Sequence, residues 1–133
     1  MARHFTCGCA LWIYDLVDDN SFTRDPVSEA LLRKVVALRQ VWLDRFGLGN
    51  FLDEQDVSYT REEDFLVKHF VTEDGAHILP CFDGLAKEGR AVHVDIPFAH
   101  ATAILPSGEE IALSASGNCV TLPTSHACLI VLK

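Results

Sequence analysis

The chain has 133 residues, of which 49% are hydrophobic, and its formal net charge is -8 at pH 7. A chain of this length fits a single domain, or a domain with an appendage, and its apolar fraction is enough for a buried core. The negative charge leaves no basic stripe to neutralise phosphates, which argues against nucleic acid and anionic membrane surfaces as partners. No apolar run approaches the roughly 18 to 20 residues that a transmembrane helix needs.

The N-terminal residues and the cysteines indicate the cellular compartment in which the protein is found. Residues 7–17 are largely apolar, but Asp15, Asp18 and Asp19 interrupt the segment and no small-residue cleavage site follows, so we expect no signal peptide. The five cysteines are an odd number, which fits reduced thiols better than a disulfide framework. We therefore expect a cytoplasmic protein.

The first predicted element is a strand over residues 5–14. Apolar and aromatic residues occupy both of its alternating faces, as in a strand that is covered on two sides. A polar loop follows. Asp25 and Pro26 then predict the start of a helix, with Asp25 as the N-cap and Pro26 at the first helical position.

Residues 28–46 carry the clearest helical period in the chain. Apolar residues step by three or four positions along this segment: Leu31, Val35, Leu38, Trp42 and Phe46. The spacing predicts an amphipathic helix whose apolar stripe faces a core. Gly47 and Gly49 supply the left-handed residues that commonly end a helix.

The remaining sequence indicates β structure. Residues 50–64 are acidic and predict a connector with one short strand at most, and a strand is expected over residues 65–71. Residues 72–75 have the composition of a hairpin turn and lead to a strand over 76–82, which Pro80 should place near a sheet edge. Val92, Val94 and Ile96 then share one face of a further strand, and His93 and Asp95 take the other. Turns are expected at residues 106–108 and 117–118.

We predict an α+β fold with two parts. Residues 1–49 form one N-terminal strand and a long amphipathic helix, and residues 50–133 form an antiparallel β-sandwich. A strand and a helix alone cannot bury both of their faces. We therefore expect a homo-oligomer, most simply a dimer, formed through residues 5–14 and 31–46.

The order of these elements has a parallel in a known class of enzymes. A strand ends in Leu11-Trp12-Ile13-Tyr14-Asp15, a loop carries Asp25-Pro26, a helix follows, and a sandwich closes on Val120-Thr121-Leu122-Pro123. This arrangement resembles the C-terminal portion of retaining TIM-barrel glycoside hydrolases. The resemblance covers nearly the whole chain, and it implies that residues 5–46 match the last strand and helix of the barrel. Residues 57–133 would match the accessory sandwich.

The resemblance carries over little of the catalytic machinery. In that family the acid/base and nucleophile carboxylates lie at the ends of the fourth and seventh barrel strands, and this chain has neither segment. The resemblance implies only a sugar-stacking aromatic residue at the end of the eighth strand, which here is Trp12.

Aromatic residues and carboxylates near residue 15 are the candidate substrate-binding group. Trp12 and Tyr14 share strand parity and lie just before Asp15, so they could form an aromatic platform beside a carboxylate, an arrangement that grips a pyranose ring. The alternative is that Trp12 belongs to the core and packs on the helix.

Two acidic clusters supply candidate catalytic carboxylates. Asp15, Asp18 and Asp19 follow the first strand, and the second cluster consists of Glu62, Glu63 and Asp64. Carboxyl groups about 5 to 5.5 Å apart suit a retaining glycosidase, and roughly 6.5 to 9.5 Å suits an inverting one. We take Asp15, Asp18 and Glu63 as candidate catalytic residues. The alternative is that both clusters are solvated turns.

Other kinds of site have little support. Cys7-Gly8-Cys9 is not a zinc knuckle, and cysteines favour core packing, so we expect no metal and no cofactor. No nucleophile elbow and no phosphate-binding glycine loop is present in the sequence. His69 and His77 could face each other across the hairpin as a cross-strand polar pair.

Two hypotheses for function remain. The first is a glycoside hydrolase-related protein that acts on or binds a glycoside, with carboxylate acid/base chemistry if it is catalytic. The second is a non-catalytic β-sandwich module that binds carbohydrate or a partner protein. In the first, the acidic clusters carry the function. In the second, Trp12 matters and the carboxylates do not.

Overall fold

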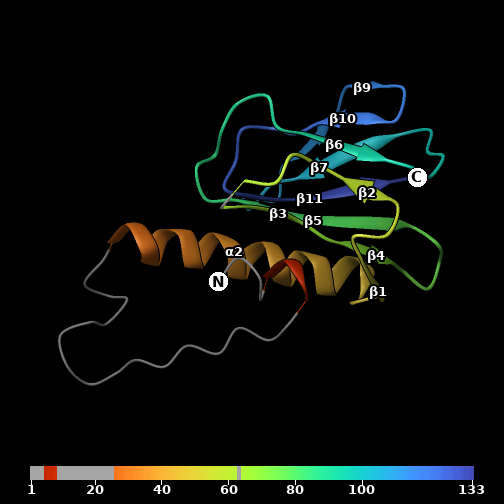
Figure 1. The fold of residues 1–133 in the computed structure, drawn as a ribbon. Helices are drawn as coiled ribbons and strands as arrows, with labels where there is room; N and C mark the ends of the chain where they lie inside the picture. The colour runs from red at the N-terminus through yellow and green to blue at the C-terminus, as the bar shows by residue number, and fades with distance from the viewer. Residues whose placement is uncertain (1–4, 9–25, 63) are drawn as a thin grey trace.

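The computed structural model describes residues 5–8, 26–62 and 64–133. In this part of the chain, a long helix lies along one side of two antiparallel sheets that pack as a sandwich (Figure 1). The predicted α+β class is confirmed. The division of the chain at residue 49 stays a prediction.

The larger sheet has the strand order β1-β4-β5-β11-β7-β8, and β3 also pairs with β5. Its strands, within the described residues, are β1 (Asn50–Asp53), β3 (Phe65–Val67), β4 (His69–Val71), β5 (His77–Asp83), β7 (Ala101–Ile104), β8 (Glu110–Ala112) and β11 (Ala127–Leu132). The smaller sheet has the order β2-β6-β10-β9. Its strands are β2 (Val57–Ser58), β6 (Ala91–Val94), β9 (Ala115–Ser116) and β10 (Cys119–Thr121).

The predicted helix is confirmed as α2 (Pro26–Phe46). Val35, Leu38 and Trp42 of the predicted stripe are fully buried against the larger sheet. The helix ends where predicted: Gly47 has a φ of 65°, and its N–H donates to the Leu43 carbonyl at 3.1 Å. The proposed N-cap, Asp25, lies outside the described residues.

β11 separates two hydrophobic cores. Its Cys128, Ile130 and Leu132 side chains belong to the core between the two sheets, whereas Leu129 and Val131 belong to the core beneath α2. Every residue of the strand is buried, because the strand is covered on both faces. The larger sheet is therefore the middle layer of three.

The predicted faces of the smaller sheet are confirmed. Val92 and Val94 are fully buried in the core between the sheets and Ile96 packs against that core, while His93 and Asp95 face solvent. The predicted turn at 106–108 is also present, since the Leu105 N–H donates to the Glu109 carbonyl at 2.9 Å. Residues 50–64 hold two short strands rather than one.

The predicted hairpin is confirmed, and its turn has the expected chemistry. The Thr72 N–H donates to the Ala76 carbonyl at 2.9 Å, and the Gly75 N–H donates to the Thr72 carbonyl at 3.0 Å. Gly75 has a φ of 83°, a conformation that glycine adopts without steric cost. Three residues, Glu73 to Gly75, thus connect the two arms, as in hairpins that close with a glycine bulge.

The prediction that Pro80 lies near a sheet edge is wrong. β5 is an interior strand, with β11 on one side and β3 and β4 on the other. The proline is tolerated there because its missing N–H faces Lys68, the residue between β3 and β4. The Lys68 N–H still donates to the Pro80 carbonyl at 3.2 Å. Proline thus splits the predicted strand 65–71 in two without displacing it.

The predicted strand over residues 5–14 is wrong for its first four residues. Phe5 and Thr6 are helical, and the Gly8 N–H closes a turn on the Phe5 carbonyl at 3.0 Å. Phe5 is fully buried, with its ring edge-on to Trp42 at a centroid distance of 6.3 Å. Packing on the helix therefore buries this apolar residue without a strand. Residues 9–14 lie outside the described residues.

Candidate functional site

Most of the candidate site residues lie outside the described residues. These are Trp12, Tyr14, Asp15, Asp18, Asp19 and Glu63. The aromatic platform and the catalytic carboxylates therefore stay predictions. Glu62 and Asp64, from the second acidic cluster, are described, and both are exposed.

Glu62 is held in ion pairs rather than free for acid/base chemistry. Its carboxylate lies 2.6 Å from the Lys87 ammonium and 2.6 Å from the Arg90 guanidinium. Hydrogen bonds from Arg90 and Lys87 lower the pKa of the Glu62 carboxyl group. A general acid needs a raised pKa, so this environment does not favour Glu62 as a proton donor.

Arg90 also holds a buried carboxylate. It donates to Asp83 at 2.9 and 3.3 Å, and both side chains are almost fully buried. Asp83 accepts further hydrogen bonds from the backbone N–H groups of Leu85 and Lys87. The guanidinium lies 4.5 Å from the centre of the Phe65 ring. This cluster fixes the loop between β5 and β6, so we assign it a structural rather than a catalytic role.

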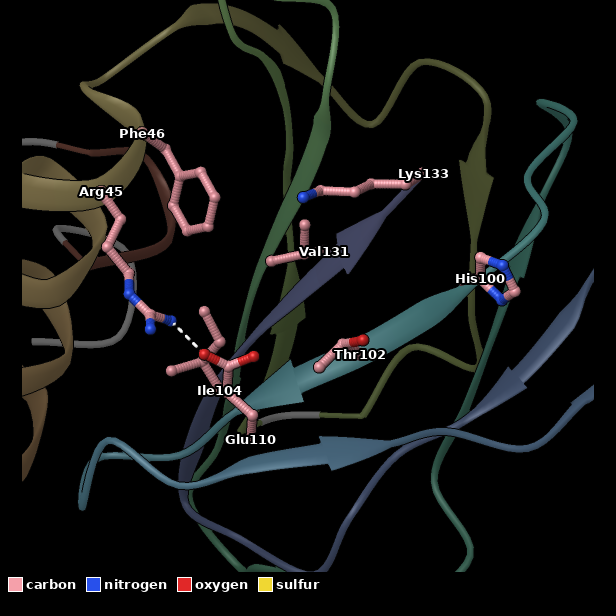
Figure 2. Close-up of a pocket in the computed structure, with 8 residues that line it drawn as sticks. All are labelled: Arg45, Phe46, His100, Thr102, Ile104, Glu110, Val131 and Lys133. Carbon is pink, nitrogen blue, oxygen red and sulfur yellow. Dashed lines mark hydrogen bonds and ion pairs between the residues drawn. The ribbon is translucent and has the colours of Figure 1, made fainter.

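A pocket of about 330 Å³ lies where the end of α2 meets β7, β8 and β11 (Figure 2). It combines an aromatic ring, an ion pair and further polar groups above an apolar floor. Its lining residues are Arg45, Phe46, His100, Thr102, Ile104, Glu110, Val131 and Lys133. The volume falls within the range of about 300 to 1,000 Å³ that is typical of small-molecule sites.

Regular secondary structure positions one side of this pocket. Arg45 and Phe46 end α2, and Arg45 reaches across to Glu110 of β8 at 2.5 Å. Glu110 pairs with Ile104 of β7, which forms part of the floor. Both members of the ion pair are about half exposed, so the pair contributes on the order of 1 kcal/mol or less to stability. Its main effect is to orient a carboxylate and a guanidinium beside the Phe46 ring.

The opposite side of the pocket comes from the ends of β7 and β11. The Lys133 N–H donates to the His100 carbonyl at 3.0 Å, and the Lys133 carbonyl accepts from the His100 N–H at 2.9 Å. Figure 2 shows the Lys133 ammonium directed toward Phe46, with Val131 beside it and Thr102 on the neighbouring strand. The pocket thus presents donors, an acceptor and a hydroxyl group to one small volume.

A second hollow adjoins the first. It has a volume of about 520 Å³ and shares Arg45 and Phe46 with the first pocket. The loop after α2 and the hairpin turn between β4 and β5 supply the rest of its lining: Gly47, Leu48, Gly49, Asn50, Glu73 and Asp74. Phe46 therefore borders both hollows.

The predicted meeting of His69 and His77 across the hairpin is present. The Nε2 atom of His69 lies 2.9 Å from the Nδ1 atom of His77, and the Nδ1 atom of His69 lies 2.7 Å from the Gln55 carbonyl oxygen. A carbonyl only accepts, so His69 donates through Nδ1 and, when neutral, accepts from His77 through Nε2. The pair thus joins the hairpin to the loop between β1 and β2.

The expectation that the cysteines pack in the core holds for Cys81 and Cys128, which pair directly across β5 and β11 and are buried. Burial, together with Cys128, raises the pKa of the Cys81 thiol. Cys7 and Cys119 are partly exposed, and Cys81, Cys119 and Cys128 are free thiols. Within the described ranges, no group of three metal-ligating side chains is arranged to hold an ion.

The pocket beside α2 was not among the predicted sites. Arg45 and Glu110 are 65 residues apart, and neither belongs to a recognisable motif. The available signals were weak: Phe46 ends the apolar stripe at a glycine, and Thr102 alternates with buried residues on β7.

None of the described helices has the length and apolarity that crossing a bilayer requires.

No protein-family model matches the chain, and no curated protein matches it significantly.

Proposed function

We propose that this chain is a β-sandwich module that binds a glycoside in the pocket between the end of α2 and strands β7, β8 and β11. The observation that carries the proposal is the Phe46 ring standing beside the Arg45–Glu110 pair in a pocket of small-ligand size. Aromatic rings pack on the C–H faces of sugars, while paired polar groups bind their hydroxyls.

The polar lining supports a sugar rather than a charged ligand. Glu110 can accept a hydrogen bond from a hydroxyl group, Arg45 and Lys133 can donate, and the Thr102 hydroxyl can do either. The pocket is lined by both a carboxylate and cations. Such a lining suits an anion less well, because the carboxylate would repel it. A neutral polyol satisfies both kinds of group.

The same pocket supports binding rather than catalysis. Glycoside hydrolysis uses two carboxyl groups, and among the described residues that line the pocket Glu110 is the one with a carboxylate side chain. Glycosidase activity through Asp15, Asp18 and Glu63 therefore remains a separate proposal. The relationship to the C-terminal portion of TIM-barrel glycoside hydrolases is likewise a proposal. A hydrolysis screen over aryl glycosides, with D15N, D18N and E63Q variants, tests it. Turnover that these variants abolish would favour an enzyme over a module.

Sugar binding is tested by titrating the protein with methyl glycosides of common hexoses and pentoses while recording amide NMR spectra. We expect saturable shifts at Phe46, Thr102 and Glu110. Phe46→Leu should weaken binding, because leucine keeps the apolar contact and removes the ring. Glu109→Gln is the matched control for Glu110→Gln, since Glu109 is also exposed and does not line the pocket.

We further propose that the protein forms a dimer through α2. Val36 and Leu43 lie seven residues apart on the helix, so they share a side, and they are 48% and 37% exposed. Light scattering should give the mass of a dimer, and a Val36→Lys, Leu43→Lys variant should give that of a monomer. A monodisperse wild-type monomer at micromolar concentration would contradict this.

A cytoplasmic location is also proposed. It is supported by the free thiols at Cys81, Cys119 and Cys128. Fractionation of cells that express the tagged protein tests it, and recovery from an oxidising compartment would count against it.

A further inference from the structure

The two hollows beside α2 meet at the last residues of the helix. Arg45 and Phe46 line both of them. A hydrogen bond from Thr72 lowers the pKa of Asp74 in the second hollow, and the charge of Lys133 in the first hollow lowers it further. Charged groups of the two hollows thus act on each other across the junction. The hollows are parts of one groove, and Phe46 lies where they join.

Each part of this groove has the volume of a small-molecule site, about 330 Å³ for the first hollow and about 520 Å³ for the second. A single sugar ring packed on Phe46 in the first hollow leaves the second hollow to solvent. A second ring, joined to the first through a glycosidic bond, continues past Phe46 and reaches the polar groups there. The longer ligand also buries more apolar surface at the junction.

The second hollow is preformed. Its two walls are the loop after α2 and the turn between β4 and β5, and the pairing of Asn50 with Val71 ties one wall to the other. Gly49 brings the loop so close to β4 that a Cβ atom on it would lie 2.7 Å from the Val71 carbonyl oxygen. Walls that are already held in place cost little ordering when a ligand binds.

The polar groups of the second hollow suit hydroxyl groups. The Asp74 carboxylate accepts a hydrogen bond from the Thr72 hydroxyl group. In the described part of the chain, no ion pair or side-chain hydrogen bond engages the exposed Glu73 carboxylate. Glu73 is therefore available to accept hydrogen bonds from a ligand, and the Asn50 amide can both donate and accept.

We propose that the groove binds a neutral oligosaccharide of at least two rings, with one ring in each hollow. The inference rests on the proposed function and adds a second subsite and the charge of the ligand. The second subsite carries the Glu73 and Asp74 carboxylates, while Arg45, which also lines it, is already paired with Glu110. Such a lining repels a uronic acid or a sulfated sugar.

The test is calorimetric titration of the full chain with matched pairs of ligands. The pairs are methyl α-glucoside with maltose, methyl β-glucoside with cellobiose, and methyl β-galactoside with lactose. For the pair that binds, we expect the disaccharide to bind at least about tenfold more tightly than the methyl glycoside, because only the disaccharide reaches hydrogen-bonding groups in the second hollow. A hyaluronan disaccharide, which carries a carboxylate, should bind more weakly than the neutral disaccharide.

Glu73→Ala separates the two subsites, because Glu73 lines the second hollow and not the first. This variant should lose about tenfold in affinity for the disaccharide and keep the wild-type affinity for the methyl glycoside, which also shows that it is folded. Glu109→Ala is the matched control, since Glu109 is likewise exposed in a hairpin turn and lines neither hollow. It should match wild type with both ligands.

The outcomes distinguish this inference from the proposed function. Equal affinities for the methyl glycoside and the disaccharide, or no effect of Glu73→Ala on the disaccharide, would overturn the second subsite and leave the glycoside pocket standing. Tighter binding of the hyaluronan disaccharide would overturn the neutral charge of the ligand. Binding of neither methyl glycosides nor disaccharides would overturn the proposed function, and the inference with it.

Discussion

The Nε2 atom of His69 lies 2.9 Å from the Nδ1 atom of His77, so two imidazoles share one hydrogen bond across the β4–β5 hairpin. His69 is fully buried, and its other nitrogen is bonded to the Gln55 carbonyl. One of the two facing nitrogens must lack a proton to accept this hydrogen bond, so the bond cannot form when both rings are charged.

The histidine pair makes stability depend on pH near neutrality. Burial, and then repulsion from His69, lower the pKa of His77 below its usual 6.5, while Asp56 opposes the shift. The unfolded chain therefore binds more protons than the folded chain just below pH 6.5, so this contribution to stability is present above that pH and lost as the pH falls. Urea unfolding at pH 7.5 and 5.5 measures the loss. His77→Gln should reduce the difference, and an unchanged difference would contradict this reading.

The Asp83–Arg90 pair should be costly to break from one side. Asp83→Asn leaves a buried guanidinium with a weaker partner, and we expect a loss of about 3 kcal/mol in the free energy of unfolding. Asp64→Asn, an exposed neighbour, is the control and should change stability by about 0.5 kcal/mol or less. Denaturant melts compare the two. Similar small effects would show that the pair does not fix the β5–β6 loop.

Trp42 should dominate the core beneath α2. Its ring lies edge-on to Phe70 at a centroid distance of 4.8 Å and is fully buried. Trp42→Ala should cost about 3 to 5 kcal/mol through the cavity it leaves. Trp42→Phe should cost less, because the indole N–H has no hydrogen-bond partner in the structure to lose. Equal losses for the two variants in thermal or urea unfolding would contradict this account of the core.

Local patterns in the sequence predicted the elements whose physical cause is local. The three-to-four spacing from Leu31 to Phe46 gave α2, and the glycine at 75 gave the hairpin turn. Pro80 shows the limit of such rules. Its interior position depends on which residue lies opposite, and Lys68 becomes its neighbour only when the hairpin has formed.

The site depends still more on tertiary structure. Arg45 and Glu110 have no feature that marks them as partners, and they meet only because α2 crosses the larger sheet beside β8. Every residue of β11 is buried, but nothing in its sequence indicates that a helix covers one of its two faces.

The central claim is that the pocket beside α2 binds a glycoside, and calorimetric titration of wild type, Phe46→Leu, Glu110→Gln and Glu109→Gln tests it most directly. For the sugar that binds best, we expect Phe46→Leu to lose about tenfold in affinity, which corresponds to about 1.4 kcal/mol. Glu110→Gln should also weaken binding, and Glu109→Gln should match wild type. No saturable binding of any sugar, or equal affinities for all four proteins, would contradict the claim.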